Sequence, residues 1–516
     1  MDNRRSFLNI FSAVVSRILL LVAALFVRRL LIQFIGNDVN GLNALFTDII
    51  GTLGIAELGI GDAIIFLMYK PIVEGRTEQT AALYHLYRKL YLIVGAVIFA
   101  GGLLVIPFLP SLISDYNTLN ENVYLSFVLL LISVVLTYVY GAKTSLIKAY
   151  KDNYITTWIL TASRLVRFAL QAVAILLWRS FPLFLSCQIV ETLLVWILTD
   201  RIVRRKHNDI LSLHEIADAR TKAEVGKNVR AMFMHRIGTV LVNSVDSVII
   251  SAFIGVVVLG KYSNYILIVG VVSGTVALFF TPLTSVIGHL CVGREGEEIK
   301  EYYDAFYSLN YILGVVFFLG YYAIVDYIIR LCFGSGLEMS GPIVFIVTLN
   351  QFTKYMRNTQ LLFRNASGTF YYDRWKPIAE GIANLVLSLL FVQIFPEEYR
   401  IAGVIAATIV TTLLICDIVD PYVVFKHVFG RKPWRFCVKN YAYIGLFVLA
   451  IFALSFLTRP FDSPLTGILV NGFISVGVSA AVLGLVFVVD KGFRHNVKTM
   501  GKKMRELVGG KRQEGN

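Results

Sequence analysis

The sequence is poor in charged residues. Asp, Glu, Lys and Arg make up 16% of its 516 residues, against about 25% in soluble domains. Hydrophobic residues make up 57%, and long hydrophobic runs recur along the whole sequence to the C-terminal region. A soluble chain of this length could not hide that much apolar surface. We therefore expect the membrane to be the solvent for most of the protein.

Signatures of several other classes are missing. The five cysteines are scattered without CxxC spacing, which argues against a disulfide framework or cysteine metal site. The seven histidines form no metal-ligand cluster. No GxxxxGK[ST] loop is present, so ATP is not expected to drive the chain. We expect no catalytic residues, no metal and no cofactor.

The net charge of +14 would suit a nucleic-acid partner, but the positions of the charges argue otherwise. Lys and Arg gather in short segments between apolar runs, as they do in membrane proteins that fix their orientation this way. We therefore expect no nucleic acid.

Hydrophobicity predicts an all-α polytopic membrane protein of about fourteen spans. They are 8–34, 42–69, 86–110, 122–147, 154–178, 181–203, 228–254, 260–290, 304–331, 341–366, 375–396, 401–426, 438–458 and 465–489. Lys and Arg concentrate at both ends and in the even-numbered connections, which predicts that both termini are cytoplasmic.

The chain also matches itself at an offset of 219 residues. Arg17 falls on Arg236, Gly36 on Gly255 and Gly41 on Gly260. The matching spans cross in the same direction, which predicts parallel repeats that rock about a central cleft. We expect an N-terminal lobe (1–205), an amphipathic cytoplasmic connector (206–227), a C-terminal lobe (228–428), two additional spans (429–490) and a basic cytoplasmic tail (491–516).

Cations within the predicted spans are the candidate functional residues. They are Arg17, Arg28, Arg29, Arg164, Arg167, Arg236, Lys354 and Arg357. Each costs about 2.5–3.5 kcal/mol if central and facing lipid. They should face a watery cavity or pair with acids. The candidate acids are Asp48, Glu57, Asp62, Glu191, Asp246, Glu380 and Asp417.

Helical spacing groups these cations into stripes. Arg164, Arg167 and Gln171 share one face, as do Asn350, Lys354, Arg357 and Arg364. Guanidinium groups bind phosphate bidentately, so a pyrophosphate passenger is expected. The predicted substrate-binding set is Arg17, Arg28, Arg164, Arg167, Arg236, Asn350, Lys354 and Arg357. The alternative is that these cations form ion pairs that hold helices together. Glu57, Asp62 and Asp246 are candidates for ion coupling or gating.

The sequence resembles the polysaccharide flippases (O-antigen and capsule, Wzx-type) of the multidrug/oligosaccharidyl-lipid/polysaccharide exporter superfamily. The residues that carry the resemblance are Asn9 through Arg17, Phe34 to Gly36 with Gly41 and Leu42, and the glycine-rich run Gly54 to Gly61. The resemblance covers essentially the whole chain, through diffuse motifs. Arg17 and Arg236 match the family's cations on the first helix of each lobe.

The resemblance implies a flippase that moves undecaprenyl-pyrophosphate-linked oligosaccharide across the bacterial cytoplasmic membrane by alternating access. The resemblance also implies a two-lobed, V-shaped exporter fold with a cationic cavity, in which spans thirteen and fourteen would help to form a groove for the lipid tail. Membrane lipids, a polysaccharide polymerase and glycosyltransferases are implied as partners, and the protein is expected to be a monomer. Two alternatives stay open: a multidrug or other exporter of the same superfamily, and a membrane-embedded polymerase or glycosyltransferase.

Overall fold

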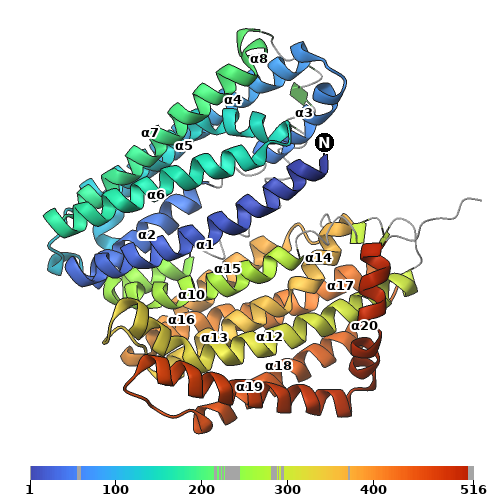
Figure 1. Ribbon diagram of the computed structural model, residues 1–516. Helices are drawn as coiled ribbons and strands as arrows, with labels where there is room; N and C mark the ends of the chain where they lie inside the picture. Colours follow the sequence, from blue (N-terminus) through green and yellow to red (C-terminus); the bar gives the residue numbers. More distant parts are fainter. Residues whose placement is uncertain are drawn as a thin grey trace, which may run out of the picture. The chain divides into compact units, whose positions relative to one another are not determined.

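The computed structural model describes residues 2–54, 60–213, 245–280, 296–369 and 372–509, with a few single residues between 215 and 226 and between 287 and 291. In this part of the chain every regular element is a helix (Figure 1). The predicted all-α class is therefore confirmed. The chain divides into two compact units, Met1–Lys261 and Tyr262–Asn516.

Eleven helices among the described residues are long and apolar enough to cross a membrane. Each of them corresponds to one of the fourteen predicted spans, so the chain is a multi-pass membrane protein. The three predicted spans without such a helix are 42–69, 228–254 and 341–366. Residues 227–244 lie outside the described residues, so most of span 228–254 is not seen.

The other two predicted spans each fall on two described helices, and residues 55–59 of the first lie outside the described residues. Span 42–69 falls on α2 (Asn37–Leu53) and α3 (Ile60–Val73). Span 341–366 falls on α13 (Gly341–Met356) and α14 (Asn358–Ala366), which meet at Arg357. The predicted span 341–366 is therefore two helices rather than one. Hydropathy registers the apolar length of this segment but not the polar junction at Arg357, whose guanidinium pairs with Asp420 and Glu380.

The first unit is a bundle of long antiparallel and parallel helices (Figure 1). Its elements are α1 (Asp2–Phe34), α2, α3, α4 (Thr77–Val105), the 3₁₀ turns η2 (Ile106–Leu112) and η3 (Tyr116–Thr118), α5 (Val123–Ala149), α6 (Asn153–Trp178), α7 (Phe181–Lys206), α8 (Asn208–Ser212) and the first turns of α10 (Val256–Phe280). Caps define several ends: Asn122 accepts a hydrogen bond from the Leu125 N–H at 3.0 Å, so α5 begins there.

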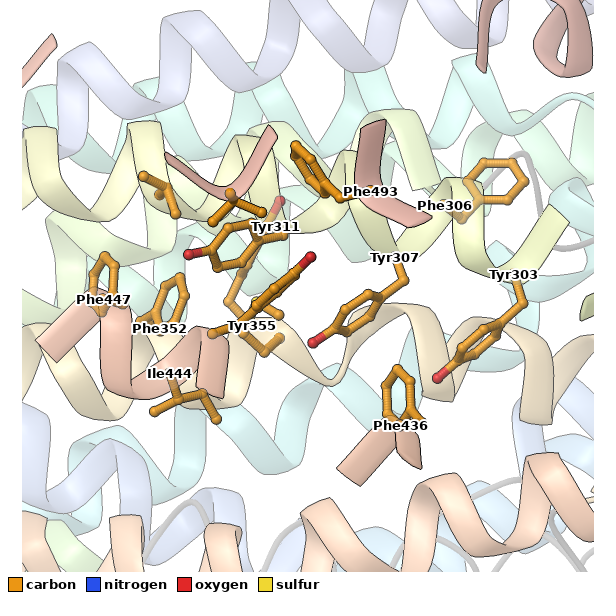
Figure 2. Close-up of a cluster of buried hydrophobic side chains, with 14 of the residues drawn as sticks. Tyr303, Phe306, Tyr307, Tyr311, Phe352, Tyr355, Phe436, Ile444, Phe447 and Phe493 are labelled. Atoms are coloured by element: carbon orange, nitrogen blue, oxygen red, sulfur yellow. The ribbon is translucent and has the colours of Figure 1, made fainter. Parts of the chain in front are cut away.

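The second unit is built around the long helix α12 (Gly296–Phe333). Its other elements are α13, α14, α15 (Lys376–Ile394), η5 (Glu397–Tyr399), α16 (Arg400–Thr411), the π-helix η6 (Thr412–Cys416), α17 (Asp417–His427), α18 (Trp434–Leu457), α19 (Pro464–Val489) and α20 (Lys491–Gly509). One face of α12 carries Tyr303, Tyr307 and Tyr311, which pack among Phe side chains of α13, α18 and α20 (Figure 2). This aromatic cluster is the core of the unit.

The described part of the connector and the tail are both helical. Ile210 of α8 is fully buried, and the Nε2 atom of His85 lies 2.7 Å from the carbonyl oxygen of Leu213, so the connector begins packed against α4. The segment expected as a basic tail forms helix α20 as far as Gly509. Its Phe493 is buried against α12 and α18, and Asn496 donates to the Asp304 carbonyl at 3.1 Å.

Asp490 joins α19 to this terminal helix. Its carboxylate accepts hydrogen bonds from Tyr443 at 2.8 Å and from the Phe493 N–H at 3.0 Å, and pairs with Lys439 at 2.9 Å. Partial burial raises the pKa of Asp490, but these bonds outweigh it and lower the pKa to about 2. Asp490 is therefore ionised at physiological pH and fixes the start of α20.

Two turns that the 219-residue offset aligns have the same backbone hydrogen bonds. The N–H groups of Ile35 and Gly36 both donate to the Leu31 carbonyl, at 3.0 and 3.1 Å. At the matching positions, Ile254 and Gly255 both donate to the Ile250 carbonyl, at 2.9 Å each. Gly36 (φ 151°) and Gly255 (φ 120°) adopt angles that other residues rarely reach. The same turn thus ends the first helix of each repeat.

The helices that follow these two turns cross each other within the first unit. A Cβ atom on Gly41 would lie 1.9 Å from the Val256 carbonyl oxygen, and one on Gly260 would lie 2.3 Å from that of Asn37. Asn37 Nδ2 donates to the Val257 carbonyl at 2.8 Å, and Asn40 Nδ2 to the Gly260 carbonyl at 3.0 Å. Only glycine permits so close an approach of the two backbones.

Replacing Gly41 should therefore separate the two helices. We expect Gly41→Ala to lower the free energy of unfolding by about 1–3 kcal/mol, because the added methyl group meets backbone. Gly51→Ala, on the same helix with nothing within 4 Å of the added Cβ, is the control and should be neutral or stabilising by up to about 1 kcal/mol. Melting temperatures in detergent measure both. Equal melting temperatures would contradict the close packing.

Candidate functional site

In the first unit, two arginines share one acid between α6 and α7. Arg164 Nε lies 3.2 Å from Glu191 Oε1, and Arg167 Nε lies 3.1 Å from Glu191 Oε2. The side chain of Arg164 is 46% exposed, whereas Glu191 is largely buried. One carboxylate cannot neutralise two guanidinium groups, so this cluster keeps a net positive charge. Glu191 was among the acids that the sequence offered as partners.

The third polar residue of this stripe has a structural role. Gln171 is buried and its Nε2 atom donates to the Phe184 carbonyl at 3.1 Å, which ties α6 to α7. Along this face of α6 the side chains therefore change from a partly exposed cation, Arg164, to a buried packing residue, Gln171.

Helix α1 brings a further cation to the neighbourhood of α6. Arg17 is exposed, and no acid of the described residues lies within 4.0 Å of it. The adjacent residue, Ser16, accepts a hydrogen bond from Thr161 of α6 at 2.8 Å, so the two helices are in contact here. On the same helix Arg28 is half-buried and Arg29 is exposed.

The predicted coupling and gating acids are only partly seen. Asp246 is buried and lies close enough to Asp48 of α2 for their carboxylates to repel, and Ser247 bonds to the Asp48 side chain. Arg236 and Glu57 lie outside the described residues, as does the side chain of Asp62. Their roles stay predictions.

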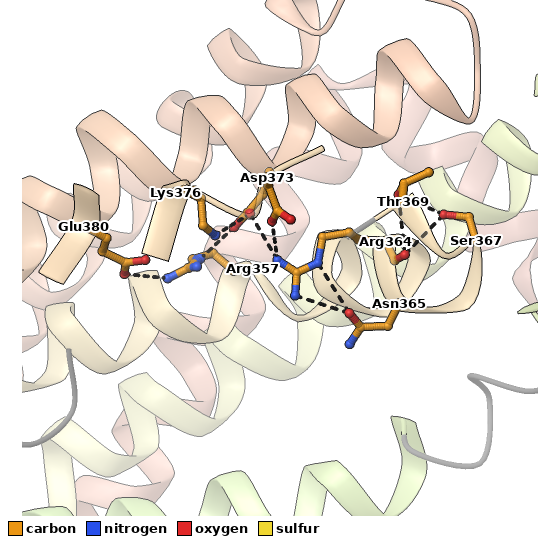
Figure 3. Close-up of polar contacts among 9 residues, drawn as sticks. Arg357, Arg364, Asn365, Ser367, Thr369, Asp373, Lys376 and Glu380 are labelled. Atoms are coloured by element: carbon orange, nitrogen blue, oxygen red, sulfur yellow. Dashed lines mark hydrogen bonds and ion pairs between the residues drawn. The ribbon is translucent and has the colours of Figure 1, made fainter. Parts of the chain in front are cut away.

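In the second unit, cations and acids form a buried network centred on Asp420 of α17. Figure 3 shows Arg357, Arg364, Asp373, Lys376 and Glu380 of this network. Arg357 Nε lies 3.1 Å from Asp420 Oδ2, Lys376 Nζ lies 2.5 Å from Oδ1, and Arg364 Nη1 lies 3.8 Å from Oδ1. The Asp420 side chain is 1% exposed. A lone carboxylate at this depth would be very costly, so the three cations account for its ionised form.

Two further acids complete the pairing. Arg357 Nη1 lies 3.4 Å from Glu380 Oε1, and Arg364 Nη1 lies 2.5 Å from Asp373 Oδ2. Three cations thus face three acids across the α13–α14 junction, α15 and α17. Arg357, predicted to line a substrate cavity, is held in an ion-pair network, which is the alternative role that the sequence left open.

The remaining predicted residues of this stripe differ from Arg357. Lys354 is half-buried and has no acid of the described residues within 4.0 Å. Asn350 is fully buried, and in the described part of the chain neither its amide nitrogen nor its oxygen has a hydrogen-bond partner. Lys354 therefore remains a candidate cation for a ligand, while Asn350 is a polar group inside the packed unit.

The sequence reading placed Glu380 correctly as an acid partner but missed others. Arg364 was on the predicted stripe without being assigned a role, and Asp373, Lys376 and Asp420 were not singled out. A signal was available for Asp420, because Asp417 and Asp420 are one turn apart in a span and two acids there require cations. The third partner, Lys376, lies at the end of a span, where a lysine is ordinarily read as an anchor.

Among the described residues there is no group of three His, Cys, Asp or Glu side chains that could hold a metal ion. The chemistry available to the described clusters is electrostatic. A net positive cluster lies in the first unit, and a charge-matched network lies in the second.

The two roles predict different effects on stability. Arg357→Ala should lower the free energy of unfolding by about 3–5 kcal/mol, since it leaves Asp420 and Glu380 short of a cation. Lys354→Ala, one turn earlier on α13, removes no ion pair among the described residues and should cost about 1 kcal/mol or less. Thermal unfolding of the purified variants measures the difference. Equal losses would contradict the division between network and free cation.

No protein-family model and no curated protein matches the chain. Among solved structures, it is similar to the lipid II flippase MurJ in an inward closed conformation, with a TM-score of 0.61 and 13% identity over 93% of this chain and 99% of that one. It is also similar to an inward-facing multidrug resistance MATE family transporter of the MOP superfamily, with a TM-score of 0.57 and 12% identity over 76% of this chain and 92% of that one. At these identities the likeness concerns the fold: the chain has the transporter fold shared by these MOP-superfamily proteins.

Proposed function

We propose that the protein is a flippase that carries an undecaprenyl-pyrophosphate-linked oligosaccharide from the inner to the outer face of the bacterial cytoplasmic membrane. The observation that carries this proposal is the excess of positive charge at membrane depth in the first unit. Arg164 and Arg167 share a single acid, and Arg17 has none among the described residues. Such a surface attracts an anion rather than a cation.

The cations of the first unit would lower the free-energy cost of moving a phosphate-bearing head group across the membrane. An isolated phosphate in hydrocarbon is prohibitively unfavourable by ion solvation, on the order of tens of kcal/mol. Guanidinium groups offset this cost because they stay charged in a low dielectric and bind phosphate oxygens in pairs. Two phosphates in one head group match several cations better than a single carboxylate does.

The last two spans support a lipid-linked passenger. Helices α18 and α19 lie outside the duplicated part of the sequence. A face of small and polar side chains on α19, including Gly467, Ser475 and Ser479, packs against α12. The opposite faces present large exposed apolar residues, among them Phe452, Phe456 and Phe473. This surface would accommodate a polyprenyl tail while the head group crosses. The flippase structure also covers more of this chain, 93%, than the multidrug transporter does, 76%.

In the mechanism that we propose, the pyrophosphate head enters from the cytoplasm while the tail stays in lipid. The cations of α1 and α6 neutralise it, and rocking of the repeats exposes it to the outer side. The protein would act as a monomer with both termini in the cytoplasm. Glycosyltransferases would supply its substrate, and a polysaccharide polymerase would consume it.

A multidrug exporter of the same superfamily is the second candidate, because a MATE transporter shares the fold. The two candidates differ in the expected sign of the site. An exporter of cationic drugs would use acids such as the neighbouring Asp48 and Asp246, whereas a flippase would use the excess arginine charge of α6. Drug susceptibility of a strain that lacks the gene separates them: unchanged susceptibility together with a defect in surface polysaccharide supports the flippase.

Arginine substitutions test the proposal in a deletion strain of the native host. The double variant Arg164→Ala/Arg167→Ala should reduce export of lipid-linked oligosaccharide at least about tenfold, because it removes two charge-assisted contacts of about 1.5 kcal/mol or more each. The precursor should accumulate on the cytoplasmic face, where extraction and mass spectrometry measure it.

Glu191→Gln is the matched control, since it removes the shared acid but keeps both cations. It should retain export at equal expression. Normal surface polysaccharide in the deletion strain would contradict the flippase, and full export by the double variant would contradict the cationic site.

A further inference from the structure

One buried acid of the second unit is left out of the ion-pair network. Asp417 is the first residue of α17 and directly follows the π-helix Thr412–Cys416. It is 1% exposed. Its Oδ2 atom accepts a hydrogen bond from Asn440 Nδ2 at 3.1 Å, and Asn440 Oδ1 accepts one from the Tyr307 hydroxyl at 2.7 Å. Within the described part of the chain, its Oδ1 atom has no partner.

The neighbouring cations are already committed. Arg357 and Lys376 are the cations that act most strongly on Asp417, yet no Lys or Arg nitrogen of the described residues comes within 4.0 Å of it. Both cations are bonded to Asp420, and Arg357 also pairs with Glu380. The network of three cations and three acids is balanced without Asp417, so an ionised Asp417 would add one uncompensated negative charge.

An uncompensated carboxylate at this depth is far less stable than a neutral carboxylic acid. The neutral acid is compatible with the observed hydrogen bond, because its carbonyl oxygen can still accept from Asn440. A metal ion fits the position poorly. Only one carboxylate oxygen is open, and no group of three His, Cys, Asp or Glu side chains exists among the described residues to complete a coordination shell.

We propose that Asp417 is a proton-binding site of the second unit, protonated at rest, and that its proton is released and taken up during transport. The second part rests on the proposed function, whereas the protonated resting state does not. On release the carboxyl O–H bond breaks, the proton passes to water, and the carboxylate that remains competes with Asp420 for Arg357 and Lys376.

This competition would act on two helix junctions. Arg357 is the residue at which α13 ends and α14 begins, and Asp417 is the residue at which the π-helix gives way to α17. A π-helix leaves the regular hydrogen-bond ladder out of step and is a frequent feature of functional sites. If Arg357 exchanges Asp420 for Asp417, the ion pair that joins the α13–α14 junction to α17 changes with it.

The groups around Asp417 all bear on its titration. They are Arg357 at the α13–α14 junction, Lys376 and Glu380 of α15, Asp420 of α17, Cys416 of the π-helix, Cys437, Asn440 and Tyr441 of α18, and Tyr303 and Tyr307 of α12. The acids and tyrosines disfavour a second negative charge, and the cations favour it. Release of the proton thus requires Arg357 or Lys376 to turn towards Asp417.

Paired amide variants test the protonated state. Asp417→Asn mimics the neutral acid and should keep the melting temperature within about 2 °C of the wild type, whereas Asp420→Asn removes a needed charge and should lower it by about 5 °C or more. The stability that a neutral buried acid contributes is present at low pH and is lost as the pH rises through its folded-state pKa. The wild type should therefore lose more stability than Asp417→Asn as the pH is raised from the ordinary pKa of an Asp to the folded-state pKa of Asp417. An Asp417→Asn variant as unstable as Asp420→Asn would overturn the assignment.

Infrared difference spectroscopy gives a readout that needs no substrate. The carbonyl stretch of a protonated carboxyl, shifted by deuterium exchange, should be present in the wild type and in Asp420→Asn, and absent from Asp417→Asn. Its presence in all three would place the proton elsewhere and overturn the proposal.

Proteoliposomes with a lipid-linked oligosaccharide test the coupling. A pH gradient should change the wild-type translocation rate severalfold and leave the rate of Asp417→Asn unchanged. A response of both proteins, or a response to a sodium gradient alone, would overturn proton coupling at Asp417. Failure of the proposed function would look different: no translocation under any gradient, with the infrared band intact.

Discussion

The cost of placing a charge in hydrocarbon governs this structure. Three largely buried basic side chains of the second unit, Arg357, Arg364 and Lys376, all lie within 4.0 Å of the Asp420 carboxylate. The acid is in turn tolerated only because the cations surround it. This mutual dependence joins the α13–α14 junction, α15 and α17, so the helices that surround the network cannot be rearranged independently.

The two units meet the same cost in different ways. In the second unit the network contains three buried cations and three buried acids, so it stabilises structure and offers little to an anion. In the first unit Arg164 and Arg167 share Glu191, and Arg164 is almost half exposed. Charge that is not cancelled inside the protein must be met by water or by a ligand. In the function that we propose, the first unit provides most of the attraction for an anionic substrate. The second unit provides the proton-binding residue, Asp417.

The sequence predicted the parts of the fold that follow from apolar length and from repetition. All eleven membrane-length helices of the described residues coincide with predicted spans, and the turns at Gly36 and Gly255 repeat the backbone geometry that their alignment implied. Hydropathy did not predict the helix break at Arg357 within span 341–366, because a break at a polar residue depends on partners that are distant in sequence. For the same reason spacing alone found the stripe of Lys354 and Arg357 but could not tell which of them is paired. Asp420 lies 63 residues from Arg357, a separation that no helical periodicity can relate.

The central claim is that the positive charge of the first unit serves a pyrophosphate-linked lipid. Translocation in proteoliposomes tests it most directly, with two fluorescent polyprenyl-linked sugars that differ only in having a pyrophosphate or a neutral linker. The account predicts outward movement of the pyrophosphate lipid by the wild type, severalfold slower movement by Arg164→Ala/Arg167→Ala, and little movement of the neutral lipid by either protein. Equal transport of the two lipids, or equal rates for the two proteins, would contradict it.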